Sequence, residues 1–547
     1  MNQLFYALIP ELILTSVACA LFVFGATGIA ALRRFSPWLA LASLPAAAWA
    51  AAYTPVWDTP IRDSMGTLFV GGFAVYIKLI TALVGILLVL VHWPTTDDAD
   101  GNSCVHFGRQ GPEYFGLMLL SLAGVMLVAG ANDVILLFLG IELAAIPTYV
   151  MVSISRPISS AQEAAVKYFF LGAFSAALTL FGLSFLFGTT GKLGLIEIAQ
   201  VLRPATGNLV QLTAWQMLAG LMVLMGLAFK MAAFPMHFYA PDVYTGAATP
   251  LTALLSYVPK AAGLVALIKV LGALFGGGNF VPPAEFVTLL WVIAVATMFV
   301  GNVLGLMQHN VKRIMACSSI AHSGYMLAGV LVAVSAGTAS VRDDALEGVL
   351  FYLAAYGVMN VGVFAVLMML PAKADPFLYE GKIPPATSAE TLGEIAGSGR
   401  QHPGLGLIMA GCCFSLVGLP LTVGFFGKLF LIRPALEASM YWLVVLMVLN
   451  AAISAGYYLR IVATMFLKDP RTEAGAPEPA GQPAAELPMP LLMAGVLSVC
   501  GSLILGTLLP ATTVLRNLTK EAVTFRVSAM PMQSQQEPPM VPVLPQP

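Results

Sequence analysis

Nine charged side chains lie inside long apolar stretches of the sequence, where a charge needs a partner or water beside it. A charge at the middle of a bilayer costs at least ~2.5 kcal/mol on insertion scales. The nine are Glu11, Lys78, Glu142, Lys167, Lys230, Lys260, Lys269, Lys428 and Arg460. Burial disfavours the charged forms of glutamate and lysine, whereas a facing opposite charge favours them. Moving a partner can therefore switch such a group between holding and releasing a proton.

Three of the nine lie too deep to reach a membrane surface. Glu142, Lys230 and Lys260 are each near the middle of an apolar stretch. We expect a Glu142–Lys230 pair that opens and closes, with Lys260 passing the proton sideways through water. Histidine titrates near neutrality, so His322 or His237 could join this route. A hydrogen-bonded packing role fits either histidine equally well.

Proline and glycine interrupt two of the stretches that carry lysines. Pro235 follows Lys230, and His237 lies one heptad after Lys230 on the same face of a continuous helix. A proline and three glycines lie within the eleven residues that end at Lys428. A break in a spanning helix is tolerated only where the freed backbone is buried in protein or lines a cavity. We therefore expect Lys428 to lie beside exposed backbone carbonyls.

The other five charges have simpler interpretations. Lys269 lies near a helix end and is expected to reach the membrane surface. Lys167 lies one turn into its helix, where a helix-end charge is common. Lys78 and Arg460 are assigned to structural pairing, and Glu11 receives no role.

Membrane-spanning helices must position these residues. Of the 547 residues, 59% are hydrophobic and 10% are charged, whereas a soluble domain is roughly a quarter charged. The apolar runs are long and continuous, so they predict helices of about 20 residues and not the alternating strands of a barrel. The fourteen predicted helices lie at about 4–32, 37–53, 66–93, 113–131, 133–153, 163–188, 212–240, 247–275, 284–307, 313–336, 345–371, 404–433, 439–466 and 487–510.

The arrangement of these helices has two weaker signals. Basic residues near the helix ends favour an N-terminus outside, and an even number of helices then places both termini on the outer, periplasmic side. The motif Glu163-x4-Tyr168 recurs as Glu347-x4-Tyr352 five helices later. An odd offset of this kind is typical of inverted repeats.

The segments between and after the helices are predicted to connect or follow them without forming helices. Loops at about 372–403 and 467–486 are polar and rich in proline and glycine, and the tail after about 527 is proline-rich. These stretches are predicted to be surface linkers and a disordered tail. The first segment has no basic leader, so it is read as a retained helix.

Composition and motifs exclude several other classes of protein. The net charge is −1 without a basic run, which argues against nucleic acid as a partner. The six cysteines form no C-x-x-C and no cluster with histidine, which argues against zinc, an iron–sulfur cluster or a disulfide scaffold. The motifs for dinucleotide binding and for ATP hydrolysis are also missing from the sequence.

The segment FKMAAFPMHFYAPDVYTGA at 229–247 resembles the central signature of the subunit N family of bacterial respiratory complex I, the NADH-quinone oxidoreductase. Further matches are EAAVKYF at 163–169, KR at 312–313, SSIAHSGY at 318–325, and the stretch from GLP to GK at 418–428. The resemblance covers nearly all predicted helices and is highly specific.

The resemblance implies two inverted five-helix repeats, each with a broken helix, the seventh and the twelfth. The expected division is 1–112 for helices 1–3, 113–275 for repeat one, 284–466 for repeat two, 487–510 for helix 14 and 511–547 for a partly disordered tail. Four residues are implied in proton translocation: Glu142, Lys230, Lys260 and Lys428. Lys167 would modulate Glu142, and His322 would join the central water chain.

The resemblance also implies what lies outside this chain. The chain would hold no cofactor or metal, because NADH, FMN, iron–sulfur clusters and quinone belong to other parts of the complex. Its partners would be subunits M, K, J and A, the lateral arm of subunit L, and the lipid of the bacterial inner membrane. Electron transfer elsewhere would drive proton pumping through this chain.

Two other functions stay open. A subunit of an Mrp-type cation/proton antiporter shares the deep lysines, and a purely structural scaffold would use the charges as static pairs. Within complex I, subunit M has a glutamate where this chain has Lys428, and subunit L needs extra length for its lateral arm. Lys78 and the proline-rich tail depart from the family pattern and receive no role.

Overall fold

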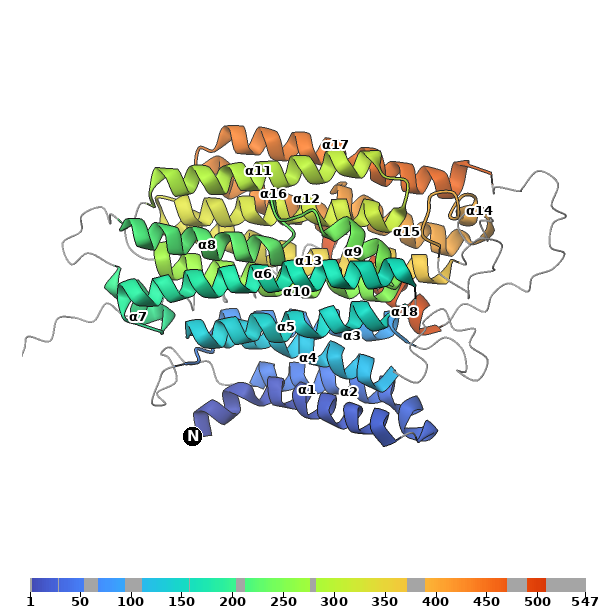
Figure 1. Cartoon of the computed structure of the whole chain (residues 1–547). Coiled ribbons are helices and arrows are strands. Elements are labelled where there is room, and N and C mark those ends of the chain that lie inside the picture. The colour runs from blue at the N-terminus through green and yellow to red at the C-terminus, as the bar shows by residue number, and fades with distance from the viewer. Residues whose placement is uncertain are drawn as a thin grey trace, which may run out of the picture.

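The computed structural model is a bundle of helices that lie roughly parallel to one another (Figure 1). It describes residues 2–27, 29–53, 67–93, 111–156, 158–202, 212–275, 282–370, 389–469 and 489–507. Within these ranges the only extended pairing is three isolated bridges. The all-α fold class predicted from the sequence is therefore confirmed.

The helices of the described residues are, in chain order, α1 (Asn2–Thr27), α2 (Ala30–Tyr53), α3 (Gly72–Val91), α4 (Gly111–Gly130), α5 (Val134–Ile154), α6 (Ser159–Thr190), α7 (Leu195–Val201), α8 (Ala214–Lys230), α9 (Ala240–Gly246), α10 (Thr249–Phe275), α11 (Ala284–Met307), α12 (Val311–Ser335), α13 (Ala339–Met369), α14 (Ser398–Gln401), α15 (Pro403–Val417), α16 (Val423–Glu437), α17 (Tyr441–Leu467) and α18 (Met489–Thr507). In Figure 1 they run from α1 and α2 on one side of the bundle to α17 on the other.

Eleven helices are long and apolar enough to cross a membrane, counted over the residues that the structure describes. The remaining crossings include the shorter apolar helices α8, α15 and α18. α8 and α9 form one interrupted crossing, and α15 and α16 form another. The chain is thus a multi-pass membrane protein, and its described residues form the predicted fourteen crossings, of which the seventh and twelfth are broken.

Three helices form the centre of the bundle. In the most apolar 18 residues of each helix, 89% of α10, 94% of α12 and 100% of α13 are buried inside the protein. α13 packs against α3, α10, α12, α15, α16 and α18. Because other helices shield these three from lipid, polar side chains on them can be held inside the protein.

Two helix starts are built in the same way. The Asp133 carboxylate caps α5 by accepting hydrogen bonds from backbone N–H groups, and the Asn310 side chain caps α12. Each capping residue also forms a bridge with a later loop, Asp133 with Gly194 and Asn310 with Thr391. α5 and α12 are five crossings apart, which is the relation that inverted repeats require.

Both interrupted crossings contain a non-glycine residue in the left-handed backbone region. α8 ends at Lys230, and Ala232 has φ 53°. α15 ends before Gly418, which has φ 88°, and Leu421 follows with φ 75°. This conformation costs a non-glycine residue ~1–2 kcal/mol, and such strain concentrates at functional sites.

Two predictions about boundaries are wrong. The seventh helix is predicted to reach residue 240, whereas α8 ends at Lys230 and turns lead to α9. The predicted linker at 372–403 is in part an ordered segment, since Ala389 and Ile395 are fully buried and α14 follows. Residues 371–388, 470–488 and 508–547 lie outside the described residues.

Candidate functional site

The first two site residues meet where α5 packs near the end of α8. The Nζ atom of Lys230 lies 3.0 Å from Oε1 of Glu142. It also donates a hydrogen bond of 3.0 Å to the hydroxyl of Tyr149. Lys230 is only 3% exposed. The predicted Glu142–Lys230 pair is confirmed, and Tyr149, which sequence reasoning missed, could have been found from its position one heptad after Glu142.

A small cavity lies between Lys230 and Lys260. Its volume is about 10 Å³, which is close to the space that one water molecule needs. Both lysines line it, together with Tyr168, Tyr239 and Tyr244. A single water in this cavity would lie between Lys230 and Lys260.

Lys260 on α10 is surrounded by hydroxyl groups. It is 2% exposed, and its Nζ donates to the carbonyl of Ser319 on α12 and lies 5.9 Å from the centre of the Tyr356 ring. The Ser319 hydroxyl lies 2.6 Å from the hydroxyl of Tyr356 and 3.2 Å from that of Tyr244. Lys260 has no carboxylate partner among the described residues. The hydroxyl groups around it can accept and donate protons in turn.

His322 follows Ser319 on the same helix and uses both ring nitrogens. Nδ1 lies 2.5 Å from the hydroxyl of Tyr352, and Nε2 lies 3.1 Å from the hydroxyl of Tyr458. A neutral imidazole has one donor and one acceptor nitrogen, so a proton that arrives at one nitrogen can leave from the other. His322 is therefore placed to take part in proton transfer.

Lys428 lies at the second helix break, as predicted. Its Nζ donates to the carbonyl oxygens of Leu416 (3.1 Å) and Val417 (2.7 Å), which end α15. It also lies 5.0 Å from the centre of the Tyr325 ring. A positive charge at these carbonyls favours the end of the helix. The expectation of an ammonium beside exposed carbonyls is confirmed.

Lys167 is placed among surface charges. Its Nζ lies 2.6 Å from a carboxylate oxygen of Glu163 and 3.3 Å from one of Asp242, and its side chain is 44% exposed. The structure thus joins Lys167 to the start of α9 and gives it no direct contact with Glu142 among the described residues.

His237 lies in the turns between α8 and α9, where its ring stacks on Phe234 with 5.7 Å between the centres. The heptad relation to Lys230 is wrong, because the helix ends at that lysine and no longer fixes which face a later residue presents.

The other deep charges are used in packing. Nζ of Lys78 lies 2.7 Å from Oε1 of Glu11, which confirms a structural pair. Lys269 does not reach freely to the surface, because its Nζ donates 2.6 Å to the carbonyl of Ala131 just after α4. The Arg460 guanidinium donates to carbonyl oxygens at the end of α11, so the partners of its structural pairing there are backbone groups.

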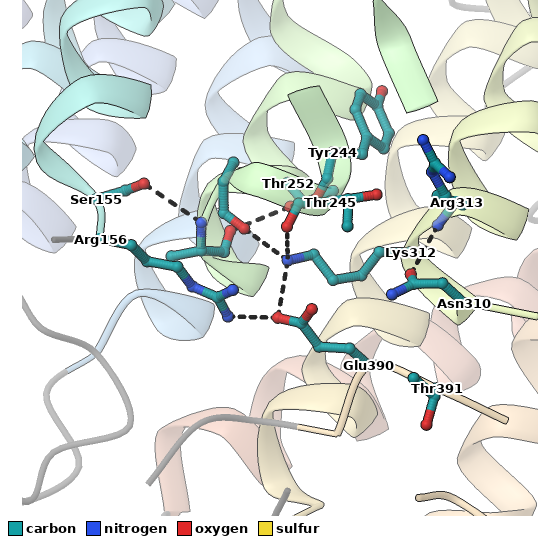
Figure 2. A network of polar contacts seen from close by, with 12 residues as sticks. Ser155, Arg156, Tyr244, Thr245, Thr252, Asn310, Lys312, Arg313, Glu390 and Thr391 are labelled. Atoms are coloured by element: carbon teal, nitrogen blue, oxygen red, sulfur yellow. Dashed lines mark hydrogen bonds and ion pairs between the residues drawn. The ribbon is translucent and has the colours of Figure 1, made fainter. Parts of the chain in front are cut away.

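A further charged group, missed by sequence reasoning, lies where α5 ends and α12 begins (Figure 2). Oε1 of Glu390 lies 2.5 Å from Nη2 of Arg156 and 3.1 Å from Nζ of Lys312. We call these three residues the junction cluster. No sequence signal pointed to it, because Glu390 lies in the stretch predicted to be a linker.

The deep groups form separate sets of contacts in the middle of the bundle. Glu142 pairs with Lys230, which shares a cavity with Lys260. Lys260 donates to the carbonyl of Ser319, whose hydroxyl contacts Tyr356. The His322 ring lies 5.1 Å from the Tyr356 ring and hydrogen-bonds Tyr352. Tyr352 packs against Gly427, the residue before Lys428. Across the described part of the chain, no group of three His, Cys, Asp or Glu residues could hold a metal ion. Carboxylate, ammonium, imidazole and hydroxyl groups can each hold or pass a proton.

Comparisons with known proteins find the same family by sequence. The family described as NADH:quinone oxidoreductase/Mrp antiporter, TM, matches residues 131–454. NADH-quinone oxidoreductase subunit N of Trichlorobacter lovleyi is 35% identical over 500 residues, which cover 91% of this chain and 93% of that protein. NADH-quinone oxidoreductase subunit N 2 of Roseiflexus castenholzii is 38% identical over 477 residues, covering 86% and 87%.

Solved structures share the fold and come from multi-subunit membrane complexes. A chain of respiratory complex I from Thermus thermophilus with bound aureothin matches with a TM-score of 0.68 and 27% identity, covering 92% of this chain and 99% of that one. A chain of the Mrp complex from Dietzia sp. matches with a TM-score of 0.73 at 19% identity, covering 95% and 99%. The Mrp likeness shows the fold alone, whereas the sequence relatives are subunit N proteins. The chain therefore belongs to the NADH:quinone oxidoreductase/Mrp antiporter family and, within it, to the subunit N proteins of NADH-quinone oxidoreductase.

Proposed function

We propose that this chain is the proton-translocating subunit N of a membrane-bound NADH-quinone oxidoreductase, and that Glu142, Lys230, Lys260 and Lys428 carry the proton. The observation that carries the proposal is the set of acid–base groups at and between the two helix breaks: the Glu142–Lys230 pair, Lys260 on the other side of the shared cavity, and Lys428 at the second break. Each charge buried in a membrane interior costs free energy. Several such charges in one protein therefore indicate a functional site.

The proton moves between named atoms. Nζ of Lys230 holds it while the Glu142 carboxylate is 3.0 Å away. When that carboxylate moves away or is neutralised, the charged lysine loses its main partner and gives its proton to a water in the adjoining cavity, and from there to Nζ of Lys260. The Ser319 and Tyr356 hydroxyls and the His322 ring pass it on toward Lys428.

The secondary residues contribute less directly. Lys167 acts on the Glu142–Lys230 pair through Asp242, its partner at the start of α9. His322 is a member of the central route, whereas His237 takes no step in it. The repeats 113–275 and 284–466 would each provide one half-channel, with 1–112, 487–510 and 511–547 outside them.

The surrounding complex supplies the energy. We infer that NADH oxidation and quinone reduction, with FMN and iron–sulfur clusters, occur in other subunits and that this chain has no redox site. Its neighbours would be subunits M, K, J and A and the lateral arm of subunit L, in a bacterial inner membrane with both termini on the periplasmic side. The names of the sequence relatives support a place in an NADH-quinone oxidoreductase.

An Mrp-type antiporter subunit is the alternative, because a chain of such a complex shares the fold. The two functions predict different copurifying subunits. A mass-spectrometric analysis of the proteins that copurify with this chain will find flavin and iron–sulfur subunits if the proposal holds, and only antiporter subunits if the alternative holds.

The mechanism is tested by Lys230→Ala in the assembled complex, reconstituted in proteoliposomes. We expect quinone reduction and proton pumping to fall together by at least ~tenfold, because a missing proton carrier interrupts the route. The matched control is Lys192→Ala, since Lys192 is exposed and pairs with Glu197 at 3.7 Å. A Lys230→Ala complex that pumps at the wild-type rate rules the proposal out.

A further inference from the structure

The second half of the first broken crossing is held by charges at both ends. Asp242, in the first turn of α9, pairs with Arg313 and Lys167. At the other end, Nζ of Lys312 donates to the carbonyl oxygens of Thr245 (3.2 Å) and Ala247 (2.6 Å). Negative charge at a helix start and positive charge at its end both stabilise the helix. The position of α9 therefore depends on where Lys312 points.

Glu390 determines where Lys312 points (Figure 2). Lys312 is fully buried, and the third acceptor of its Nζ is Oε1 of Glu390 at 3.1 Å. The same oxygen accepts a hydrogen bond of 2.5 Å from Arg156. Burial raises the pKa of Glu390, but the charges of Lys312 and Arg156 outweigh burial and hold this pKa below its usual value. Glu390 is thus ionised at neutral pH and separates two positive charges.

Glu390 is itself firmly placed. Its carbonyl accepts a hydrogen bond of 2.7 Å from the N–H of Val311 at the start of α12. Its own N–H and that of Thr391 donate to one carboxylate oxygen of Glu394, at 2.7 and 2.6 Å. A carboxylate on so constrained a turn can hold its partners in one geometry.

α9 in turn forms part of the site. Tyr239, Ala240, Val243 and Tyr244, at or just before this helix, line the cavity between Lys230 and Lys260. The Tyr244 hydroxyl also contacts the hydroxyl of Ser319, whose carbonyl accepts from Lys260. A shift of α9 would therefore change the water site and the surroundings of Lys260 at the same time.

We propose that Glu390 is a positioning residue for proton transfer between Lys230 and Lys260: by holding Lys312 against the end of α9, it fixes the wall of the cavity between the two lysines. This inference rests on the proposed function. Arg156 lies two residues after the end of α5, the helix that carries Glu142, so the junction cluster ties the two sides of the first proton step together. Transfer through a single water needs close spacing of donor and acceptor, and a shift of 1 Å can cost about 100-fold in rate.

The test compares Glu390→Gln and Glu390→Asp in the whole complex. For Glu390→Gln we expect kcat of quinone reduction and pumping to fall about tenfold, with KM for NADH and quinone unchanged, because both substrates bind elsewhere. Glu390→Asp keeps the charge and is expected to recover most of the loss. Hydrogen exchange of the amides in 240–248 should rise in Glu390→Gln, while exchange in 134–146 stays at the wild-type level.

A double variant separates this role from general damage. If Glu390 acts through Lys312, adding Glu390→Gln to Lys312→Gln causes no loss beyond that of Lys312→Gln alone. Losses that multiply overturn the inference, and so does a Glu390→Gln complex with wild-type kcat and wild-type exchange in α9. If the Glu390→Gln complex fails to assemble, Arg156→Gln is measured in its place. A smaller loss of kcat is then expected, because Lys312 keeps the carbonyls of Thr245 and Ala247 and the Glu390 carboxylate as acceptors.

The matched control is Glu437→Gln, which removes an exposed carboxylate 3.0 Å from Arg433 and should change neither kcat nor α9 exchange. The proposed function and this inference fail in different ways. A fully active Lys230→Ala complex refutes the relay, whereas inactive Lys230→Ala beside fully active Glu390→Gln refutes only the positioning role.

Discussion

Replacing Glu142 with glutamine tests the first proton step at its charged pair. The substitution keeps the shape of the side chain and removes the negative charge 3.0 Å from Nζ of Lys230. The Tyr149 hydroxyl, also at 3.0 Å, remains as a neutral partner. Two unit charges at this distance attract by ~5 kcal/mol in an effective dielectric of about 20. Removing one partner of a buried pair costs ~3–5 kcal/mol, which is consistent with that attraction.

The penalty falls on the charged form of Lys230. A penalty of about 3 kcal/mol changes the equilibrium between the held and released arrangements of the Lys230 ammonium by more than ~100-fold. Because the charged lysine is the form that passes a proton to Lys260, we expect kcat of quinone reduction to fall at least ~tenfold in the Glu142→Gln complex. The measurement is quinone reduction and proton uptake by proteoliposomes that contain the purified complex.

An exposed pair of the same length provides the comparison. Glu437→Gln removes a carboxylate 3.0 Å from Arg433 on a solvent-facing helix turn. Exposed pairs contribute only ~0.2–1 kcal/mol, so activity should stay at the wild-type level. If the Glu142→Gln complex also keeps its turnover and pumps the same number of protons per NADH, the charge on Glu142 has no part in the relay.

Three further predictions concern stability and the second break. Lys428→Met leaves the two carbonyls that end α15 without a donor, so we expect lower thermal stability and lost pumping, with Lys428→Arg restoring stability in a thermal-shift assay. Leu421 is 67% exposed with φ 75°, so Leu421→Gly should stabilise the complex by ~1–2 kcal/mol, while the β-branched side chain of Leu421→Ile should destabilise it; equal melting temperatures for the two would show that the backbone there is relaxed. Lys78→Met leaves Glu11 buried without its cation and should cost ~3–5 kcal/mol, and adding Glu11→Gln should recover most of the lost yield and melting temperature.

The parts of the fold that depend on local signals could be predicted. Long apolar runs identified the crossings, and the depth of Glu142 and Lys230 identified their pairing. The break before Lys428 was placed correctly because Pro420 and its neighbouring glycines lie at the break itself. In each of these cases the signal and the structure occupy the same few residues.

The first break was predicted at Pro235, which lies within it, but its start at Lys230 could not be predicted because long-range contacts decide where it begins. Pro235 suggested an interruption near residue 235, yet α8 already ends at Lys230. The freed N–H of Phe234 donates 2.9 Å to the hydroxyl of Thr297 on α11, an acceptor that no local pattern indicates. The face argument for His237 failed for the same reason.

Glu390 was missed because its partners are distant in the sequence. Arg156 precedes it by 234 residues, and Lys312 by 78. Its neighbours Thr391 and Glu394 are polar, as in a surface loop, and only the folded chain shows that Ala389 and Leu392 beside them are buried. Charged pairs that join the two repeats are therefore invisible to a reading based on periodicity and composition.

The complete burial of α13 has a consequence for how the protein is made in the cell. One face of α13 is covered by α18, and Gly362 on α13 lies so close to Ser498 that a side chain at position 362 would collide with it. α18 is the last described helix to be synthesised. Until it has been made, the face of α13 that it covers must contact lipid or the insertion machinery. Assembly of the helices around Tyr352 and Tyr356 on α13 is thus completed only after α18 has been made, and a chain cut before residue 489 would be inserted yet not assembled.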